Sequence, residues 1–182
     1  MKKLIVMLAI LVGTMQFGFA QKVPYDSVKK QIIYTEVVQV PNADKGKIFD
    51  KATNTLNTIY NEAAKKMDTK DREAGNIEMK CTTRVMLMDP KTKMLVADKE
   101  FIKYKLKISV KDGKYKYDFY DFHIDKGGFK YPIEKFVQND HTVTKETRAP
   151  EKLEYLDKDI KGIIEKLKAG IAGEKVQVKE DW

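Results

Sequence analysis

The sequence predicts an α+β domain in which an antiparallel, curved sheet carries two helices packed on one face. Two stretches with apolar residues at three- and four-residue steps indicate the helices. Between them, long segments alternate apolar and polar residues, which is the period of strands with one buried face. The predicted order is strand, helix, three strands, a weaker fourth strand, and a closing helix.

The first residues, MKKLIVMLAILVGTMQFGFAQK, have the pattern of a secretory signal peptide. Lys2 and Lys3 precede an apolar run, and Gly18 and Ala20 occupy the small-residue positions before a cleavage site. We expect residues 1–20 to be a signal peptide cleaved after Ala20, and the protein to be exported, periplasmic or secreted. A membrane helix needs about 20 apolar residues, so the chain is not expected to span the membrane.

Residues 21–170 are expected to form a single domain, and residues 171–182 a C-terminal tail. Cleavage removes two of the 35 basic residues and none of the 27 acidic ones, which leaves a net charge of +6. This balance suits acidic partners, and export argues against intracellular nucleic acid. The single cysteine, Cys81, cannot form an internal disulfide.

The N-terminal half begins with a β-branched run, QIIYTEVVQV, that is ended by Pro41 and predicts a strand. Asn42 or Asp44 is expected to cap the helix that follows. The helix buries one apolar face, formed by Ile48, Phe49, Ala52, Leu56, Ile59, Tyr60 and Ala63. The charged segment MDTKDREAG then predicts a surface connection.

From Asn76 the period of the apolar residues changes to two. Ile77, Met79, Cys81, Val85 and Leu87 share one side of the first of these strands. After the turn DPKTK and a short apolar piece, the next strand buries Ile102, Tyr104, Leu106, Ile108 and Val110 and exposes Lys103, Lys105 and Lys107. Asp112 and Gly113 then predict a type I′ hairpin turn.

The hairpin turn predicts the register of the strand KYKYDFYDFHID, which follows it. It pairs Val110 with Tyr115, Ile108 with Tyr117 and Leu106 with Phe119. After Phe119 the alternation shifts by one residue, and a β-bulge at Phe119–Tyr120 would return Tyr120, Phe122 and Ile124 to the apolar side. In the bulged register, four further pairs of residues are opposite each other. They are Tyr104–Phe122, Ile102–Ile124, Lys103–His123 and Lys105–Asp121.

Residues 126–149 contain a Gly-Gly turn and predict at most one more strand. Pro150 suits the first turn of the closing helix. The helix extends to about Ala169 and carries an apolar stripe of Leu153, Leu156, Ile160, Ile163, Ile164 and Leu167.

Two candidate sites lie on the polar face of the bulged hairpin. Asp121, His123 and Asp125 alternate along one strand, so any two of them could reach a single metal ion, although neighbouring lysines favour a solvated, charge-paired face. The second candidate is an anion-binding stripe of Lys103, Lys105 and Lys107, which would include Tyr120 if the strand had no bulge. Solubility and edge protection are the simpler account of these lysines. Without the bulge, Tyr120 and Phe122 would join the lysines in a platform for glycan or single-stranded nucleic acid.

Catalytic signals are weak. Cys81 lies on the apolar side of its strand, where a cysteine packs as a small hydrophobe. Ser27 and Ser109 are the only serines, and neither lies in a G-x-S-x-G motif. The chain has no Walker loop, dinucleotide-binding glycine pattern, paired CxxC or HExxH, so no cofactor is predicted.

Three segments resemble a secreted bacterial family of unknown function that is described as having a TATA-binding-protein-like (TBP-like) fold. They are VVQVPNADKGKIFDKA, DREAGNIEMKCTTRV and YKLKISVKDGKYKYDFYDF, which lie within Val37 to Phe122. The resemblance implies the fold and is almost silent on activity. The name of the fold implies nothing about DNA, because function belongs to sites.

The leading functional hypothesis is an exported noncatalytic module, a monomer or weak oligomer, in the cell envelope. It would bind a partner protein, or a small ligand held between the sheet and the last helix. The alternative is a metal-assisted hydrolytic enzyme that uses Asp121, His123 and Asp125. A third possibility is a structural component of the envelope that self-associates.

Overall fold

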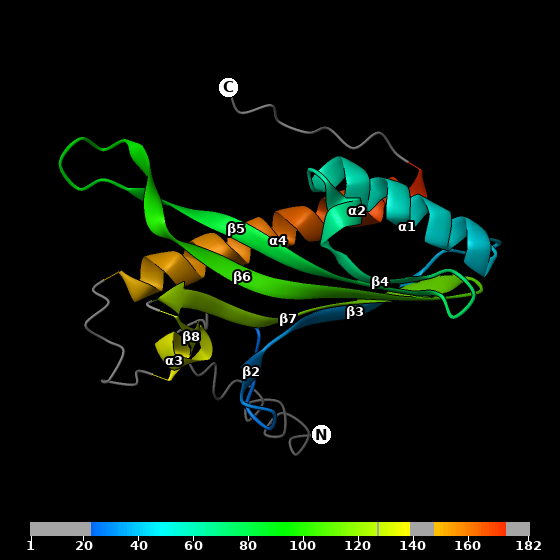
Figure 1. The fold of residues 1–182 in the computed structure, drawn as a ribbon, viewed down its shortest axis with the longest axis horizontal. Helices are drawn as coiled ribbons and strands as arrows, with labels where there is room; N and C mark the ends of the chain where they lie inside the picture. Colours follow the sequence, from blue (N-terminus) through cyan, green and yellow to red (C-terminus); the bar gives the residue numbers. More distant parts are fainter. Residues whose placement is uncertain (1–22, 127, 139–147, 174–182) are drawn as a thin grey trace, which may run out of the picture.

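The computed structural model describes residues 23–126, 128–138 and 148–173. Within them, one antiparallel sheet has two long helices on one of its faces (Figure 1). The predicted α+β architecture is therefore confirmed. The predicted signal peptide lies outside the described residues, as do residues 174–182 of the predicted tail and residues 139–147.

The sheet has the strand order β3-β7-β6-β5-β4, and β8 pairs with β7 beyond this path. Every pair of neighbouring strands is antiparallel. The strands are β3 (Tyr34–Gln39), β4 (Met67–Asp71), β5 (Asn76–Met88), β6 (Leu95–Lys111), β7 (Lys114–Lys126) and β8 (Phe129–Pro132).

The β6–β7 hairpin has the predicted register up to Phe119, including the Val110–Tyr115 pair. Its turn is not the predicted type I′, because only Gly113 has a positive φ, of 71°, and Asp112 does not. The turn is instead held against the start of α1 (Lys45–Ile59). Asp112 Oδ1 accepts from Lys45 N at 2.7 Å, and Gly113 N donates to Ala43 O at 2.9 Å.

The β-bulge exists but lies further along β7 than predicted. Lys105 pairs with Tyr120 and Lys103 with His123, so β7 has one extra residue between these pairs. Asp121 occupies that bulge with a φ of 60°, a left-handed conformation that aspartate tolerates better than most residues. Phe122 therefore returns to the core, whereas Tyr120, predicted on the core side, lies on the other face.

The prediction of a surface connection after α1 is wrong in part. Met67–Asp71 forms β4, an edge strand paired with β5. Four of the five residues of β4 are exposed, so the sequence of this strand lacks the alternation of apolar and polar residues that predicts a strand. Charged residues on an edge strand also hinder pairing with other chains. At the other edge, the predicted first strand divides into β2 (Gln31–Ile32), which pairs with β1 (Tyr25–Asp26), and β3.

The helices follow their predicted apolar faces. Asp44 caps α1, its side chain accepting from Lys47 N at 2.7 Å. Glu62, at φ 56°, separates α1 from the short helix α2 (Ala63–Lys66). The closing helix α4 (Ala149–Ala172) has Pro150 in its first turn and continues to Ala172. The short helix α3 (Glu134–Val137) precedes it.

The core lies between α1, α4 and the covered face of the sheet. Its largest fully buried side chains include Tyr104, Tyr115, Phe49, Phe119 and Phe122. The rings of Tyr104 and Phe122 stack with centroids 5.4 Å apart, across the bulge. None of the helices in the described part of the chain is sufficiently long and apolar to cross a membrane.

Candidate functional site

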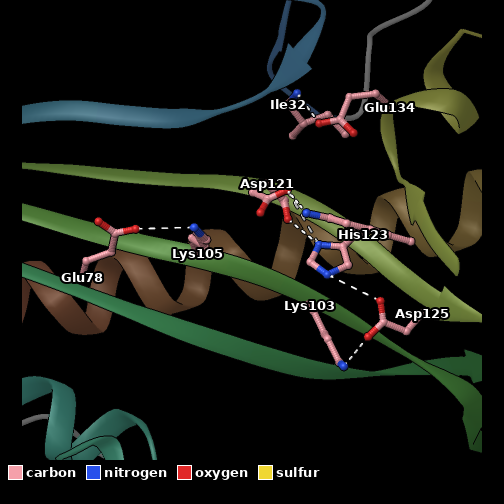
Figure 2. Close-up of polar contacts among 9 residues, drawn as sticks. Ile32, Glu78, Lys103, Lys105, Asp121, His123, Asp125 and Glu134 are labelled. Atoms are coloured by element: carbon pink, nitrogen blue, oxygen red, sulfur yellow. Dashed lines mark hydrogen bonds and ion pairs between the residues drawn. The ribbon is translucent and has the colours of Figure 1, made fainter. Parts of the chain in front are cut away.

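The helices cover one face of the sheet, so alternate side chains of β5, β6 and β7 point to the other side, which we call the open face. Figure 2 shows part of this face, with α4 behind the sheet. Glu78 and Lys80 belong to β5, Lys103 and Lys105 to β6, and His123 and Asp125 to β7. These positions follow from the two-residue period of the strands.

A groove of about 730 Å³ crosses this region from β8 to β4 and α2. Six lysines and three aspartates line it, so its charge is predominantly positive. The lining residues are Lys65, Lys66, Asp68, Lys80, Cys81, Thr82, Lys103, Tyr104, Lys105, Asp121, His123, Asp125 and Lys130. Its volume lies within the range of small-molecule sites, about 300–1,000 Å³.

The aspartates of the groove pair with its lysines. Lys130 Nζ lies 2.6 Å from Asp121 Oδ1, and Lys80 Nζ lies 3.0 Å from Asp68 Oδ1. Lys103 pairs with Asp125, and its hydrogen bond holds the pKa of that carboxyl below its usual range. Such exposed pairs contribute little stability, because solvent screens them. An anionic ligand could therefore compete for these lysines.

His123 lies between the two carboxylates of β7 (Figure 2). Its Nδ1 is 2.8 Å from the backbone oxygen of Asp121, and since a carbonyl only accepts, Nδ1 carries the proton. Its Nε2 lies 3.7 Å from Asp125 Oδ1. The imidazole thus connects the bulge to the carboxylate that holds Lys103.

The structure brings together the three predicted metal ligands, Asp121, His123 and Asp125, on one edge of the groove. Both carboxylates are already paired with lysines. Across residues 23–126, 128–138 and 148–173, no group of three His, Cys, Asp or Glu side chains is arranged to hold a metal ion. The metal site remains a prediction from spacing, and a cation would have to displace Lys103 and Lys130.

The predicted anion-binding stripe is divided by the structure. Lys103 and Lys105 line the groove, whereas Lys107 and Tyr120 do not. The Tyr120 hydroxyl donates to Glu78 Oε1 at 2.9 Å. Burial, followed by that hydrogen bond, raises the pKa of Tyr120 to about 12. Phe122 is buried, so the aromatic platform that it would form with Tyr120 is absent.

Three of the four remaining groove lysines, Lys65, Lys66 and Lys130, come from elements that the sequence did not reveal. The alternation of β5 did place Lys80 on the polar face. Lys65 and Lys66 reach the groove because the chain turns at Glu62, where no glycine marks the left-handed residue. Lys130 lies on β8, in the segment with the weakest strand signals.

Cys81 is 2% exposed, and burial raises the pKa of its thiol to about 12. It lies close to a buried pair of hydroxyls, Tyr60 and Tyr104, whose oxygens are 3.1 Å apart. A thiolate is the reactive form of cysteine, so this environment confirms the prediction that Cys81 packs as a small hydrophobe.

The space between the sheet and α4 is filled with apolar side chains. Leu156, Ile160 and Leu167 of α4 are 0% exposed and belong to the core cluster. A ligand could enter there only by displacing close-packed side chains, which is costly. The described residues therefore leave no room for the ligand predicted between the sheet and the last helix, and the groove lies on the open face instead.

A curved antiparallel sheet with helices on one face and the other face open defines the TBP-like class of folds. The sequence model of a family described as a domain of unknown function (DUF4468) with TBP-like fold matches residues 34–125. The chain belongs to this family. None of the curated proteins compared with the chain matches it.

Two solved structures share the fold. A TBP-like protein from Parabacteroides distasonis has a TM-score of 0.67 at 15% identity, over 85% of this chain and 99% of that one. A DUF4468 family protein from Bacteroides ovatus has a TM-score of 0.62 at 13% identity, over 87% of this chain and 95% of that one. At these identities the similarity concerns the fold alone.

Proposed function

We propose that the protein is an exported, noncatalytic binding module whose open-face groove takes a compact anionic ligand in the cell envelope. The groove itself is the observation that carries this proposal: six lysines and three aspartates surround about 730 Å³. The signal-peptide pattern of residues 1–20 supports export.

The electrostatics of the groove favour an anion over a cation. Each groove aspartate has a lysine within ion-pair distance, and Lys65 and Lys66 extend the positive charge to the far end. Lys105 adds a loose pair, its Nζ lying 3.7 Å from Glu78 Oε1. Phosphate, sulfate or carboxylate groups could replace these carboxylates as partners of the lysines.

Native mass spectrometry of residues 21–182, recovered from a secreting host, is the first test. A retained anionic molecule would support the proposal and identify the ligand. Calorimetric titration with inositol hexakisphosphate, a compact polyanion, is the second test. We expect binding that weakens as salt is raised, because salt screens exposed charges.

The variants Lys103→Gln and Lys105→Gln should each weaken binding of that probe roughly fivefold to tenfold. Lys107→Gln is the matched control, because Lys107 shares the strand and the face but does not line the groove. Equal losses in all three variants would show diffuse attraction to a basic surface and would contradict a defined site. If the wild type does not bind inositol hexakisphosphate, that result would also count against an anion-binding groove.

A further inference from the structure

The β5–β6 hairpin lies at one end of the sheet (Figure 1). The end of this hairpin carries a cluster of exposed apolar side chains. Met88 is 48% exposed, Met94 65%, Leu95 63% and Val96 41%. These four, with Lys91 and Lys93 of the connecting turn, are called the hairpin tip. They are half of the eight large hydrophobic side chains that are exposed among the described residues, so the tip concentrates them at one place.

The hairpin tip is held in a defined conformation. Asp89 Oδ1 accepts from Lys91 N and Thr92 N, both at 2.8 Å, and Asp89 N donates to Met94 O at 2.8 Å. Arg148, beside the start of α4, donates to Met88 O at 2.6 Å. The apolar side chains are therefore presented outward by an ordered turn.

The base of the hairpin is fastened to α4 by a buried charge. Lys152 is 3% exposed, and its Nζ lies 2.9 Å from both Asp98 Oδ2 and Glu100 Oε2. Phe101 of β6 is also exposed, but its ring lies under the Arg84 guanidinium, whose carbon is 5.5 Å from the ring centroid. On this hairpin, the exposed apolar surface is therefore concentrated at the tip.

The charge around the tip is positive. Lys91 and Lys93 form no ion pair with any described residue, and the Asp89 carboxylate is occupied by backbone N–H groups. Asp98 and Glu100 are turned to Lys152. Apolar side chains flanked by unneutralised lysines match the two layers of an anionic bilayer surface, the hydrocarbon and the headgroups.

We propose that the hairpin tip docks the domain on an anionic lipid bilayer, with Met94 and Leu95 entering the interface. A second copy of the chain fits less well, because a stable protein interface takes roughly 20–30 residues a side. The lysine pair of one copy would also repel that of another. This surface lies beyond the groove, and the proposal does not depend on the ligand bound there.

Co-sedimentation of residues 21–182 with vesicles tests the docking. We expect binding to vesicles of equimolar phosphatidylglycerol and phosphatidylcholine, and little binding to phosphatidylcholine alone. Met94→Ser and Leu95→Ser should each reduce the binding roughly tenfold, and Lys91→Gln with Lys93→Gln should reduce it to a similar extent. All these side chains are exposed, so thermal midpoints should stay close to that of the wild type.

Phe129→Ser is the matched control, because Phe129 is 69% exposed on β8, away from the tip. It should bind vesicles like the wild type, and so should the groove variant K103Q/K105Q. A fluorophore on Leu95→Cys should shift to the blue on vesicles; buried Cys81 should stay unlabelled.

Three results would overturn the proposal. One is that the wild type binds neither kind of vesicle, or both equally. Another is that Met94→Ser and Leu95→Ser bind as tightly as Phe129→Ser. The last is a dimer in solution that the tip variants abolish, which would assign the tip to a second copy of the chain.

Discussion

Gly170 of α4 lies directly against Thr55 of α1, and a Cβ on Gly170 would come within 2.4 Å of both Oγ1 and Cγ2 of Thr55. Thr55 is itself held in place, since its hydroxyl donates to Lys51 O at 2.8 Å. The two helices therefore approach each other as closely as they do because position 170 has no side chain.

Gly170→Ala should destabilise the protein by about 1–3 kcal/mol, because the added methyl forces the helices apart. Gly162→Ala, on the same helix, has open space around its Cβ position. It should instead stabilise the protein by up to about 1 kcal/mol, as alanine does in helices. Urea unfolding of both variants provides the measurement. Equal effects would show that the contact with Thr55 is not tight.

Lys152→Met should cost about 3–5 kcal/mol of unfolding free energy, because it leaves the carboxylates of Asp98 and Glu100 without their buried cation. The control is Lys161→Met, on the same helix, whose lysine is 66% exposed and pairs with Asp157. Its cost should remain below about 1 kcal/mol. Chemical unfolding followed by circular dichroism would compare them, and similar costs would contradict a buried role for Lys152.

The Asp98–Lys152 pair should also make the free energy of unfolding depend on pH. Burial would raise the pKa of Asp98, but the hydrogen bond and charge of Lys152 hold it below its ordinary value of 3.8. A carboxyl with a lowered folded pKa stabilises the fold above its unfolded pKa, and this contribution is lost as pH falls through the folded pKa. The stability gap between the wild type and Asp98→Asn should therefore close below about pH 4. A gap that is constant with pH would contradict the pairing.

Cys81 should not react with Ellman's reagent at pH 8 in the folded protein, because its thiol is buried and its pKa is about 12. Full reaction is expected once denaturant exposes the strand. The variant Thr82→Cys, made together with Cys81→Ala, places a thiol on the exposed neighbour and should react at once. Comparable rates for the two thiols in native protein would show that this part of the core opens readily.

Much of the fold could be predicted because the strands have a strict two-residue period. In β6, Ile102 to Val110 alternate with lysines, and the Asp112–Gly113 pair sets the register of β7. The same alternation shows that β7 has an extra residue. It does not locate the bulge, because Asp121 can adopt the left-handed conformation that moves the bulge past Tyr120.

Only part of the groove could be predicted. Lys103, Lys105, His123 and Asp125 come from two neighbouring strands, so the hairpin register places them together. Lys65, Lys66 and Lys130 are brought there by a turn at Glu62 and by a strand on the far side of β7. These are tertiary contacts, which the local periodicity of a sequence does not contain.

The strand order β3-β7-β6-β5-β4 has a consequence for the path of folding. From β4 to β8, each new strand pairs with the one before it, so residues 67–132 can assemble through hairpins that close short loops. By contrast, β3 can pair only after β7 has formed, since Val38 pairs with Tyr115. This pairing closes a long loop, and long loops close slowly. We expect the meander to form the folding nucleus, with Ile108→Ala giving a higher φ-value than Val38→Ala. The reverse order would place nucleation at the N-terminal edge of the sheet, where β3 joins β7.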